Sequence, residues 1–454
     1  MEKQPKTIGE ILIENGVLTK DQLIAALKIQ KKEGGLIGEI LIRDGFVNKD
    51  DIINALIKQC DYLYFPKERP VELLKKKFWI IVTSLFLTFF SLLFFEYIPF
   101  AKAIDRKLYR ALLKTEYYLV QPPAAINDIL LVTIDDKTLS AMPYRWPYPR
   151  SDFIKVIENL RMNRPRVIAL DFAFFGKSNA ADDASLINTL NFENEIILPS
   201  IINEQGELDF SNMLSANVTN SGIITKIQDS DGAIRRCLTY LVSADKDKAS
   251  QGFLPWEIQI LRRIKNIDLK SFSSTDSTFR FKNSLGEEWI VPVEADTKSF
   301  LIHFRAYTRD FPRISFYQVL TGNFDANLVK NKIVMVGTFS PILQDLEYTA
   351  IGWLPGLTVN ANAFLTLYTH NFLKNAPKYA EYAISLLGII FGAFFITWLS
   401  PFRTKILIFS EILLFFLLSF ILLLYGYIWN YAVFPLAVAL FPILSKKFIY
   451  FLRK

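Results

Sequence analysis

Four long apolar runs interrupt a chain in which apolar and polar positions otherwise alternate. The first run, Phe78–Phe95, contains no charged residue, and the other three lie near the C-terminus at Tyr382–Leu399, Ile406–Trp429 and Tyr431–Leu444. A helix of about 18 residues crosses a hydrocarbon core of roughly 30 Å. The pattern therefore predicts a multi-domain membrane protein with four transmembrane helices and one large domain between the first and the second.

Short apolar runs separated by helical patterns fill this large domain. The predicted strands are Ile129–Ile134, Val167–Leu170, Ile196–Ile201, Phe300–Phe304 and Ile333–Val336, and helical patterns include Phe153–Leu160 and Leu357–Leu373. All-apolar strands that alternate with helices indicate a sheet covered on both faces, with parallel connections. We therefore expect a mixed α/β domain with a largely parallel sheet. Phe279–Val293 predicts an antiparallel hairpin, and Ala101–Val120 predicts a helix that continues the first membrane helix outward.

The N-terminal segment is a tandem repeat. Ile8–Gln30 aligns with Ile37–Gln59 after a shift of 29 residues, with 13 of 23 positions identical. In each copy a short apolar helix ends at a glycine, and a second helix begins after Thr19 or Asn48, both good N-cap residues. Leu23, Ala26, Leu27 and Gln30 recur at helical spacing and predict one buried face. The segment is expected to be a small all-α domain.

These patterns divide the chain into eight parts. They are a helical head (1–65), a basic linker (66–77), a first transmembrane helix (78–98), the large domain (99–378), three more transmembrane helices (380–400, 406–429 and 430–447) and a short tail (448–454).

The charge distribution predicts the orientation. Residues before Phe78 include 14 Lys and Arg against 12 Asp and Glu, those from Pro401 onward include 6 against 1, and the stretch between them balances at 32 against 32. The basic excess thus flanks the membrane segments on one side, which the positive-inside rule makes cytoplasmic. We expect a multi-pass protein of the inner (plasma) membrane with both termini in the cytoplasm and the large domain outside. Because the excess is juxtamembrane, the sequence pI of 9.0 gives no reason to expect nucleic-acid binding.

Cysteine and histidine are too scarce for the usual metal or disulfide frameworks. Cys60 and Cys237 fall on opposite sides of the predicted membrane, and His303 and His370 have no metal-binding spacing. No nucleophile–base set and no Walker A sequence is visible. We expect a protein that is not an enzyme and that has no metal site.

Acidic and polar residues follow several predicted strands. Carboxyl ends of parallel strands form the usual ligand crevice of such sheets. Their carboxylates either hold a cation there or cap adjacent helices and accept hydrogen bonds from loop amides. The candidate sensor-ligand residues are Asp135, Asp136, Arg150, Asp171, Thr338 and Asp345.

The tandem motif of the head resembles the N-terminal domain of type II secretion and type IV pilus assembly ATPases. Some members of that family bind cyclic di-GMP through this motif, near its glycines. The resemblance implies the nucleotide-binding candidates Gly9, Leu12, Gly16, Gln30, Gly38, Leu41, Gly45 and Gln59. The arginine that opens each copy in the family is replaced by Thr7 and Leu36, neither of which offers a guanidinium fork. The head is therefore either a cyclic di-GMP module or a protein-docking module, with no other cofactor expected.

The large domain resembles the second type of the CHASE family of extracellular sensory domains. The family marks stand here as Ile134-Asp135-Asp136, Trp146-Pro147-Tyr148-Pro149-Arg150 and Ala169-Leu170-Asp171, followed by DSDGAIRR (229–236), NKIVMVG (331–337), Asp345 and PGLTVNANA (355–363). Asn360 stands where the family usually has histidine, and Ala350 where it often has proline. Family members usually carry a catalytic output domain after the third C-terminal helix, where this sequence has only Ser445–Lys454.

The two resemblances together imply a transmembrane sensor. Its exported domain would receive a signal, and its head would pass the signal to a cytoplasmic or membrane protein partner or respond to the cyclic dinucleotide. The alternative is a scaffold subunit of a bacterial secretion or pilus-type assembly. The expected partners are the lipid bilayer, this protein partner and a second copy of the chain. Gly388 and Gly392 have the small-xxx-small spacing of packed membrane helices, and Glu411 is an ionisable residue inside the third run.

Overall fold

The computed structural model describes residues 6–64, 78, 82, 86, 98–174, 176, 178–191, 195–201, 221–240, 254–343, 345–396, 401–432, 434–436 and 438. These residues belong to two compact units, one formed by 1–84 with 445–454 and the other by 85–444. The predicted linker, nearly all of the first predicted membrane helix, most of the fourth and the tail lie outside the described residues.

The head consists of four helices in the order that the repeat predicts. They are α1 (Ile8–Glu14), α2 (Lys20–Glu33), α3 (Ile37–Arg43) and α4 (Lys49–Tyr64). The side chain of Thr19 caps α2, and Asn48 exchanges hydrogen bonds with Asp51 at the start of α4. Gly16 and Gly45 follow α1 and α3 with φ of 71° and 72°, a conformation that glycine adopts without strain. The predicted caps and helix ends are confirmed.

The two repeats interlock rather than fold separately. Helix α1 packs against α4, and α2 packs against α3, around a core that includes Ile11, Leu12 and Leu41. The predicted buried face is right for Ala26 but wrong for Leu27, which is 46% exposed. Because α2 packs on α3 of the other repeat, fewer of its apolar side chains are buried than the sequence pattern predicts.

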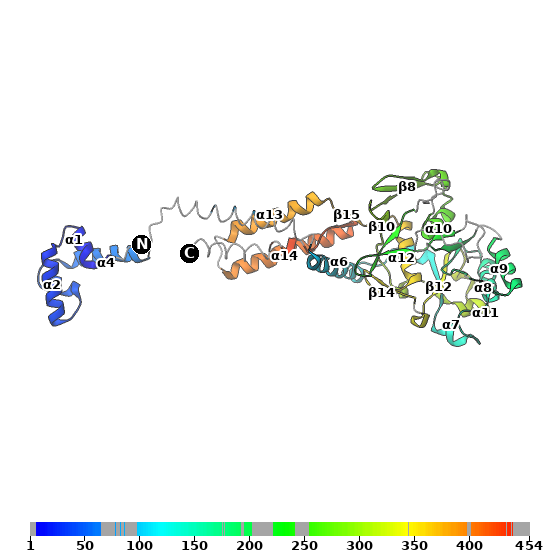
Figure 1. The fold of residues 1–454 in the computed structure, drawn as a ribbon, viewed down its shortest axis with the longest axis horizontal. Helices are drawn as coiled ribbons and strands as arrows, with labels where there is room; N and C mark the ends of the chain where they lie inside the picture. Colours follow the sequence, from blue (N-terminus) through cyan, green and yellow to red (C-terminus); the bar gives the residue numbers. More distant parts are fainter. Residues whose placement is uncertain are drawn as a thin grey trace. The chain divides into compact units, whose positions relative to one another are not determined.

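The large domain is built on a six-stranded parallel sheet with the order β11-β1-β12-β2-β3-β4. Figure 1 shows the domain, with β12 of this sheet labelled among the helices. All five neighbouring pairs are parallel, as expected for strands that connect through helices. The strands are β1 (Ile129–Ile134), β2 (Val167–Leu170), β3 (Ile196–Ser200), β4 (Ser221–Ile223), β11 (Arg313–Ser315) and β12 (Ile333–Thr338). The mixed α/β fold with a largely parallel sheet is confirmed.

Helices cover both faces of this sheet. Leu130 and Val132 pack on one side with the helices α7 to α9 and α11, while Ile129 and Leu131 pack on the other side with α10 and α12. The helices are α7 (Asp136–Ala141), α8 (Arg150–Met162), α9 (Ala180–Asn191), α10 (Trp256–Lys265), α11 (Phe316–Thr321) and α12 (Gly356–Tyr368). The strands are apolar at every position because each face meets a helix layer.

Two further sheets lie beside the parallel one. The first has the order β10-β6-β13-β14, with β5 also paired to β6, and the second is β7-β8-β9. Their strands are β5 (Lys226–Gln228), β6 (Ile234–Leu238), β7 (Ser273–Ser274), β8 (Thr278–Lys282), β9 (Glu288–Pro292), β10 (Ser299–Leu301), β13 (Leu346–Thr349) and β14 (Gly352–Pro355). Short 3-10 helices are η1 (Ala124–Asp128), η3 (Leu269–Ser271), η4 (Thr308–Asp310), η5 (Ala326–Leu328) and η6 (Pro341–Leu343).

The structure corrects two strand and helix predictions. The run Phe300–Phe304 does not join the parallel sheet; β10 ends at Leu301 and pairs antiparallel with β6. The helix predicted over Leu357–Leu373 ends at Tyr368, because the chain turns at His370, whose φ is 54°. The predicted hairpin is β8–β9, with Phe279 opposite Val291.

The helices that join the domain to the predicted membrane region belong to the same unit. They are α6 (Pro99–Leu119), α13 (Lys378–Ile396) and α14 (Pro401–Leu424). Strand β15 (Lys374–Asn375), before α13, pairs with β16 (Tyr427–Ile428), after α14. Among the described helices, Phe402–Leu424 is long and apolar enough to cross a membrane. Gly388 lies against the Phe434 ring so closely that an added methyl group would be 2.5 Å from it. Glu411 is buried within α14.

Candidate functional site

The carboxyl ends of three neighbouring strands meet at one edge of the parallel sheet. In register, Ile134 at the end of β1 lies opposite Thr338 of β12, and Val336 of β12 lies opposite Leu170 of β2. Asp171 therefore follows β2 beside the end of β12, and its backbone amide donates to the Val336 carbonyl at 2.8 Å. This edge is the place where the strand pattern predicts a ligand crevice.

Three of the six predicted residues form one polar cluster in the crevice. The Thr338 hydroxyl donates to the Asp345 carboxylate, and Asn360 of α12 donates to Asp171 at 3.2 Å. Gly356 brings the start of α12 so close that a methyl group there would lie 2.7 Å from the Asp345 carboxylate. We call Asp171, Thr338, Asp345 and Asn360 the crevice cluster.

A buried ion pair lies beneath the crevice cluster. Lys226 of β5 and Glu257 of α10 approach to 2.8 Å with almost no exposure, and the thiol of Cys237 lies 3.4 Å from Glu257. Burial and the neighbouring Asp345 raise the pKa of Asp171 well above its usual range, although the positive charge of Lys226 opposes this. Burial also raises the pKa of Asp345. Both carboxyl groups are thus shifted toward the protonated form relative to a carboxyl group in water.

The other three predicted residues serve local structure. Asp135 is the N-cap of α7, where its side chain accepts from the Thr138 amide at 2.9 Å, so the capping alternative is confirmed for it. Asp136 accepts from the Ser340 hydroxyl at 2.6 Å. Arg150 is buried at the start of α8, three residues before the predicted helical pattern, and pairs with Asp183 of α9. These contacts do not bring Arg150 into the crevice cluster.

Several members of this site were not predicted from the sequence. Asn360 stands out there only as a departure from a family pattern, and neither Lys226 nor Glu257 stands out at all. Lys226 and Glu257 are 31 positions apart on elements whose pairing depends on the fold, so no local spacing predicts them. Among the described residues, no group of three or more His, Cys, Asp or Glu is placed to hold a metal ion.

The candidate nucleotide residues of the head have structural roles that the repeat duplicates. Gln30 donates to the Gly35 carbonyl at 2.9 Å, and Gln59 donates to the Lys6 carbonyl at 3.0 Å. Gly35 and Lys6 are themselves 29 positions apart, so each glutamine fastens the entry of the other repeat. Leu12 and Leu41 are fully buried, and Gly9 and Gly38 allow the two helices of each repeat to approach closely. These roles explain the motif residues whether or not a nucleotide binds.

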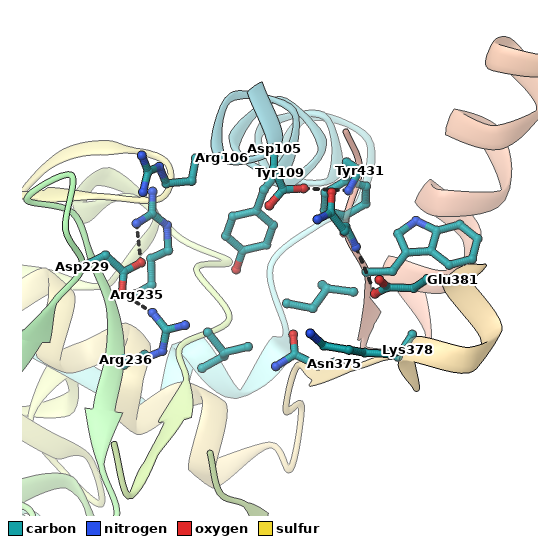
Figure 2. Close-up of a pocket in the computed structure, with 15 residues that line it drawn as sticks. Asp105, Arg106, Tyr109, Asp229, Arg235, Arg236, Asn375, Lys378, Glu381 and Tyr431 are labelled. Atoms are coloured by element: carbon teal, nitrogen blue, oxygen red, sulfur yellow. Dashed lines mark hydrogen bonds and ion pairs between the residues drawn. The ribbon is translucent and has the colours of Figure 1, made fainter. Parts of the chain in front are cut away.

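A second set of contacts connects the large domain to α6 and to the outer ends of α13 and α14. Asp105 of α6 accepts from the Tyr431 amide at 2.6 Å, and Glu381 of α13 accepts from the Asn430 amide at 3.1 Å (Figure 2). Arg106 of α6 lies 3.4 Å from Asp231 in the turn before β6. We call this region the junction.

The junction contains several buried charged side chains that are held by hydrogen bonds. Arg235 forms two hydrogen bonds to Asp231, at 2.8 and 2.9 Å, and this lowers the pKa of Asp231 to about 2. Burial raises the pKa of Asp105 to about 6, although backbone amides at Tyr431 and Ala432 counteract part of the effect. A small change in the position of α6 would therefore disturb several charge-assisted hydrogen bonds together.

A buried triad holds α6 against the domain farther along. Glu116 is 1% exposed; its carboxylate lies 2.8 Å from His303 Nε2 and 3.0 Å from the Arg305 guanidinium. Arg305 also donates to the Gln121 carbonyl at 3.0 Å. The backbone amides of His303 and Arg305 donate to Thr366 and Asn362 of α12, the helix that also supplies Asn360 to the crevice cluster. Helix α12 thus links the crevice to α6.

The CHASE2 domain family matches residues 80–398. The chain belongs to the CHASE2 family. CHASE2 domains are extracellular sensory domains of membrane proteins, so the α/β fold described above is that of a sensory domain. Neither the curated proteins nor the solved structures contain a match to the chain.

The extent of the match bears on the domain boundaries. It begins before α6 and ends two residues after α13, so it includes α6 and α13 but not α14. The matched region is thus longer than the stretch from Ile134 to Ala363 over which the sequence motifs occur. Helix α6 and its buried triad lie within the matched residues.

Proposed function

We propose that this protein is a transmembrane sensor whose exported CHASE2 domain transmits a signal to membrane helices through α6 and α12. The observation that carries the proposal is the buried triad Glu116–His303–Arg305. It ties α6 to the segment that α12 holds, and α12 reaches the crevice cluster through Asn360. Packed helices that switch between two discrete arrangements are a common means of transmitting a signal through a protein.

The crevice cluster is the proposed sensory site. Its paired carboxyl groups, an amide and a hydroxyl suit a small polar ligand that both donates and accepts hydrogen bonds. A ligand that exchanges its hydrogen bonds with Asn360 would act directly on α12. The ligand would have to bind the two arrangements of the domain with different affinity, since equal affinity shifts no equilibrium.

The protein is proposed to cross a bacterial-type inner membrane four times, with both termini in the cytoplasm. The apolar helix Phe402–Leu424 and the basic residues that flank the apolar runs support it. Reporter fusions after Lys77, Arg403 and Lys454 are expected to behave as cytoplasmic, and one after Leu373 as exported. An exported signal from any of the first three would contradict the topology.

The head is proposed to relay the signal to a protein partner, without catalysis by this chain. Leu27 and Leu56, at equivalent positions of the two repeats, are both exposed, which supports contact with another protein. Thr7 caps α1 and Leu36 is exposed at the entry of α3, so neither supplies the guanidinium fork of the cyclic di-GMP-binding relatives. We expect calorimetry on residues 1–70 to show weak or no binding of cyclic di-GMP. A sub-micromolar Kd, about −8 kcal/mol or stronger, would overturn this.

The alternative function is a scaffold in a bacterial secretion or pilus-type assembly. Both functions use a docking head, so the discriminating measurement is on the exported domain. Envelope extracts fractionated by size can be added to the purified full chain while labelling of the buried Cys237 thiol is followed, in a Cys60→Ser background. A small-molecule fraction that slows labelling supports the sensor, and slowing reversed by Asn360→Ala places the ligand in the crevice. Stable co-purification with secretion components and no ligand response supports the scaffold.

A further inference from the structure

A cavity of about 360 Å³ lies in the junction (Figure 2). Its lining comes from α6, from the turn and strand around Asp229 and Arg236, from the start of α13 and from the segment at β16. Its volume is within the range of small-ligand pockets. None of the predicted site residues lines it.

Three buried polar atoms at this cavity have no hydrogen-bond partner among the described residues. They are the hydroxyl groups of Tyr109 and Tyr431, which are 6% and 1% exposed, and Nε of Arg235, which is 3% exposed. Figure 2 shows the Tyr109 ring extending from α6 into the space between the arginines and the start of α13. Each buried polar group without a partner costs roughly 1–3 kcal/mol. Nε of arginine only donates, so an acceptor such as a phosphate oxygen would satisfy it.

The charged side chains around the cavity are nearly balanced, and both signs occur on each side of it. Arg235 and Arg236 come from β6 of the large domain, Asp105 and Arg106 come from α6, and Glu381 comes from the start of α13 (Figure 2). Asp229 and Lys378 complete the charged lining. A strongly charged anion would meet carboxylates as well as arginines, whereas a zwitterion could place its phosphate near the arginines and its ammonium near the carboxylates.

The cavity lies where α14 ends and α13 begins. Trp429 and Tyr431 line it within a few residues of Leu424, the end of the apolar helix. Tryptophan and tyrosine gather at the headgroup level of bilayers, where one side of the ring is apolar and the other is wet. Ile428, Leu301 and Ala376 add apolar surface.

We propose that this junction cavity binds an ammonium–phosphate head group, as in phosphatidylethanolamine of the outer leaflet. The phosphate accepts hydrogen bonds from Tyr109, Tyr431 and Arg235 Nε, and the ammonium donates to Asp105 and Glu381. Because α6, α13 and the turn before β6 all contribute, an occupied cavity holds the CHASE2 domain in one position on its membrane helices. This inference rests on the proposed topology, which places the junction at the outer surface of the membrane.

The test uses the full chain purified in detergent without phosphatidylethanolamine. Dioleoyl phosphatidylethanolamine, dioleoyl phosphatidylglycerol and soluble glycerophosphoethanolamine are titrated separately, with bound molecules counted by native mass spectrometry and the Tm followed. One molecule of the phosphatidylethanolamine is expected to bind and to raise the Tm. The phosphatidylglycerol is expected to bind at least tenfold more weakly. Binding of the lipid alone assigns the source to the bilayer; equal binding of the soluble compound confirms the same pocket chemistry with a ligand from solution.

Tyr109→Phe removes only the hydroxyl and leaves the ring packing. We expect roughly tenfold weaker lipid binding, about 1.4 kcal/mol, with an unchanged or slightly higher Tm in the absence of lipid. Tyr148→Phe is the matched control, because the Tyr148 hydroxyl is also buried without a partner but lies in the core on the other face of the sheet.

Equal lipid affinity of the wild type and Tyr109→Phe would overturn the proposal, as would equal binding of the two lipids. An equal loss of lipid affinity in Tyr148→Phe would also overturn the proposal, since loss of any buried tyrosine hydroxyl would then weaken lipid binding. The reporter fusions test the topology independently, so a failure of binding in a protein with confirmed topology refutes the cavity alone.

Discussion

Removing the charge of Glu116 should loosen α6 from the CHASE2 domain. In Glu116→Gln the side chain keeps its size, but the Arg305 guanidinium stays buried without its carboxylate. Loss of one member of a buried ion pair typically costs about 3–5 kcal/mol. We expect a value near 3 kcal/mol, because Arg305 keeps its hydrogen bond to the Gln121 carbonyl at 3.0 Å. For a domain of this size, that loss corresponds to a Tm lower by roughly 6–12 °C.

The buried thiol of Cys237, 1% exposed, provides a local assay. In a Cys60→Ser background, the rate at which a maleimide labels Cys237 reports how often the domain opens. When closing is fast relative to labelling, a loss of about 3 kcal/mol raises the labelling rate by roughly 150-fold. The control is Asp276→Asn, whose partner Lys298 lies at 3.4 Å but whose side chain is 98% exposed. It should change neither the Tm nor the labelling rate measurably.

The double variant Glu116→Gln with Arg305→Met separates charge from packing. If the cost arises from an unpaired buried guanidinium, the double variant should be about 2 kcal/mol more stable than the sum of the single changes predicts. Strict additivity, or a loss below about 1 kcal/mol in Glu116→Gln, would refute the reasoning and leave α6 held by apolar packing and the junction contacts.

Two further predictions concern single positions. Asp105 has a pKa of about 6 in the folded protein against an ordinary 3.8, so the fold binds this proton more tightly than the unfolded chain does and gains stability as the pH falls from above 6 toward 3.8. Asp105→Asn should therefore raise the Tm at pH 7.5, with a difference that shrinks toward pH 4.5; an equal difference at both values would show that Asp105 does not titrate there. Gly222 packs against backbone, since an added methyl group would lie 2.5 Å from Trp256 Cα. Gly222→Ala should cost about 1–3 kcal/mol in thermal unfolding, and an unchanged Tm would mean that the start of α10 can move away.

The sequence alone determined the elements whose signal is local. The strands β1 and β2 coincide with their apolar runs, because a strand buried on both faces has no polar position to blur its ends. The head repeat, its caps and the glycines after α1 and α3 were equally readable, since capping depends on residues three positions apart. The motifs at the strand ends were enough to indicate the family, because each motif is a short contiguous run of the chain.

Only the tertiary structure decided which of these residues meet. Asp135 and Asp171 follow strands in the same way, yet one caps α7 and the other joins the crevice cluster, because α12 reaches only the second. Leu27 is exposed because its helix packs on the other repeat. Strand β10 is not part of the parallel sheet because it pairs antiparallel with β6. Glu116 contacts His303 and Arg305 although almost 190 positions separate them in the sequence. The residues that line the junction cavity are also far apart in the sequence, the first being Asp105 and the last Tyr431. Burial and charge pairing at such separations depend on the packing of helices on sheets, and a linear pattern contains no record of that packing.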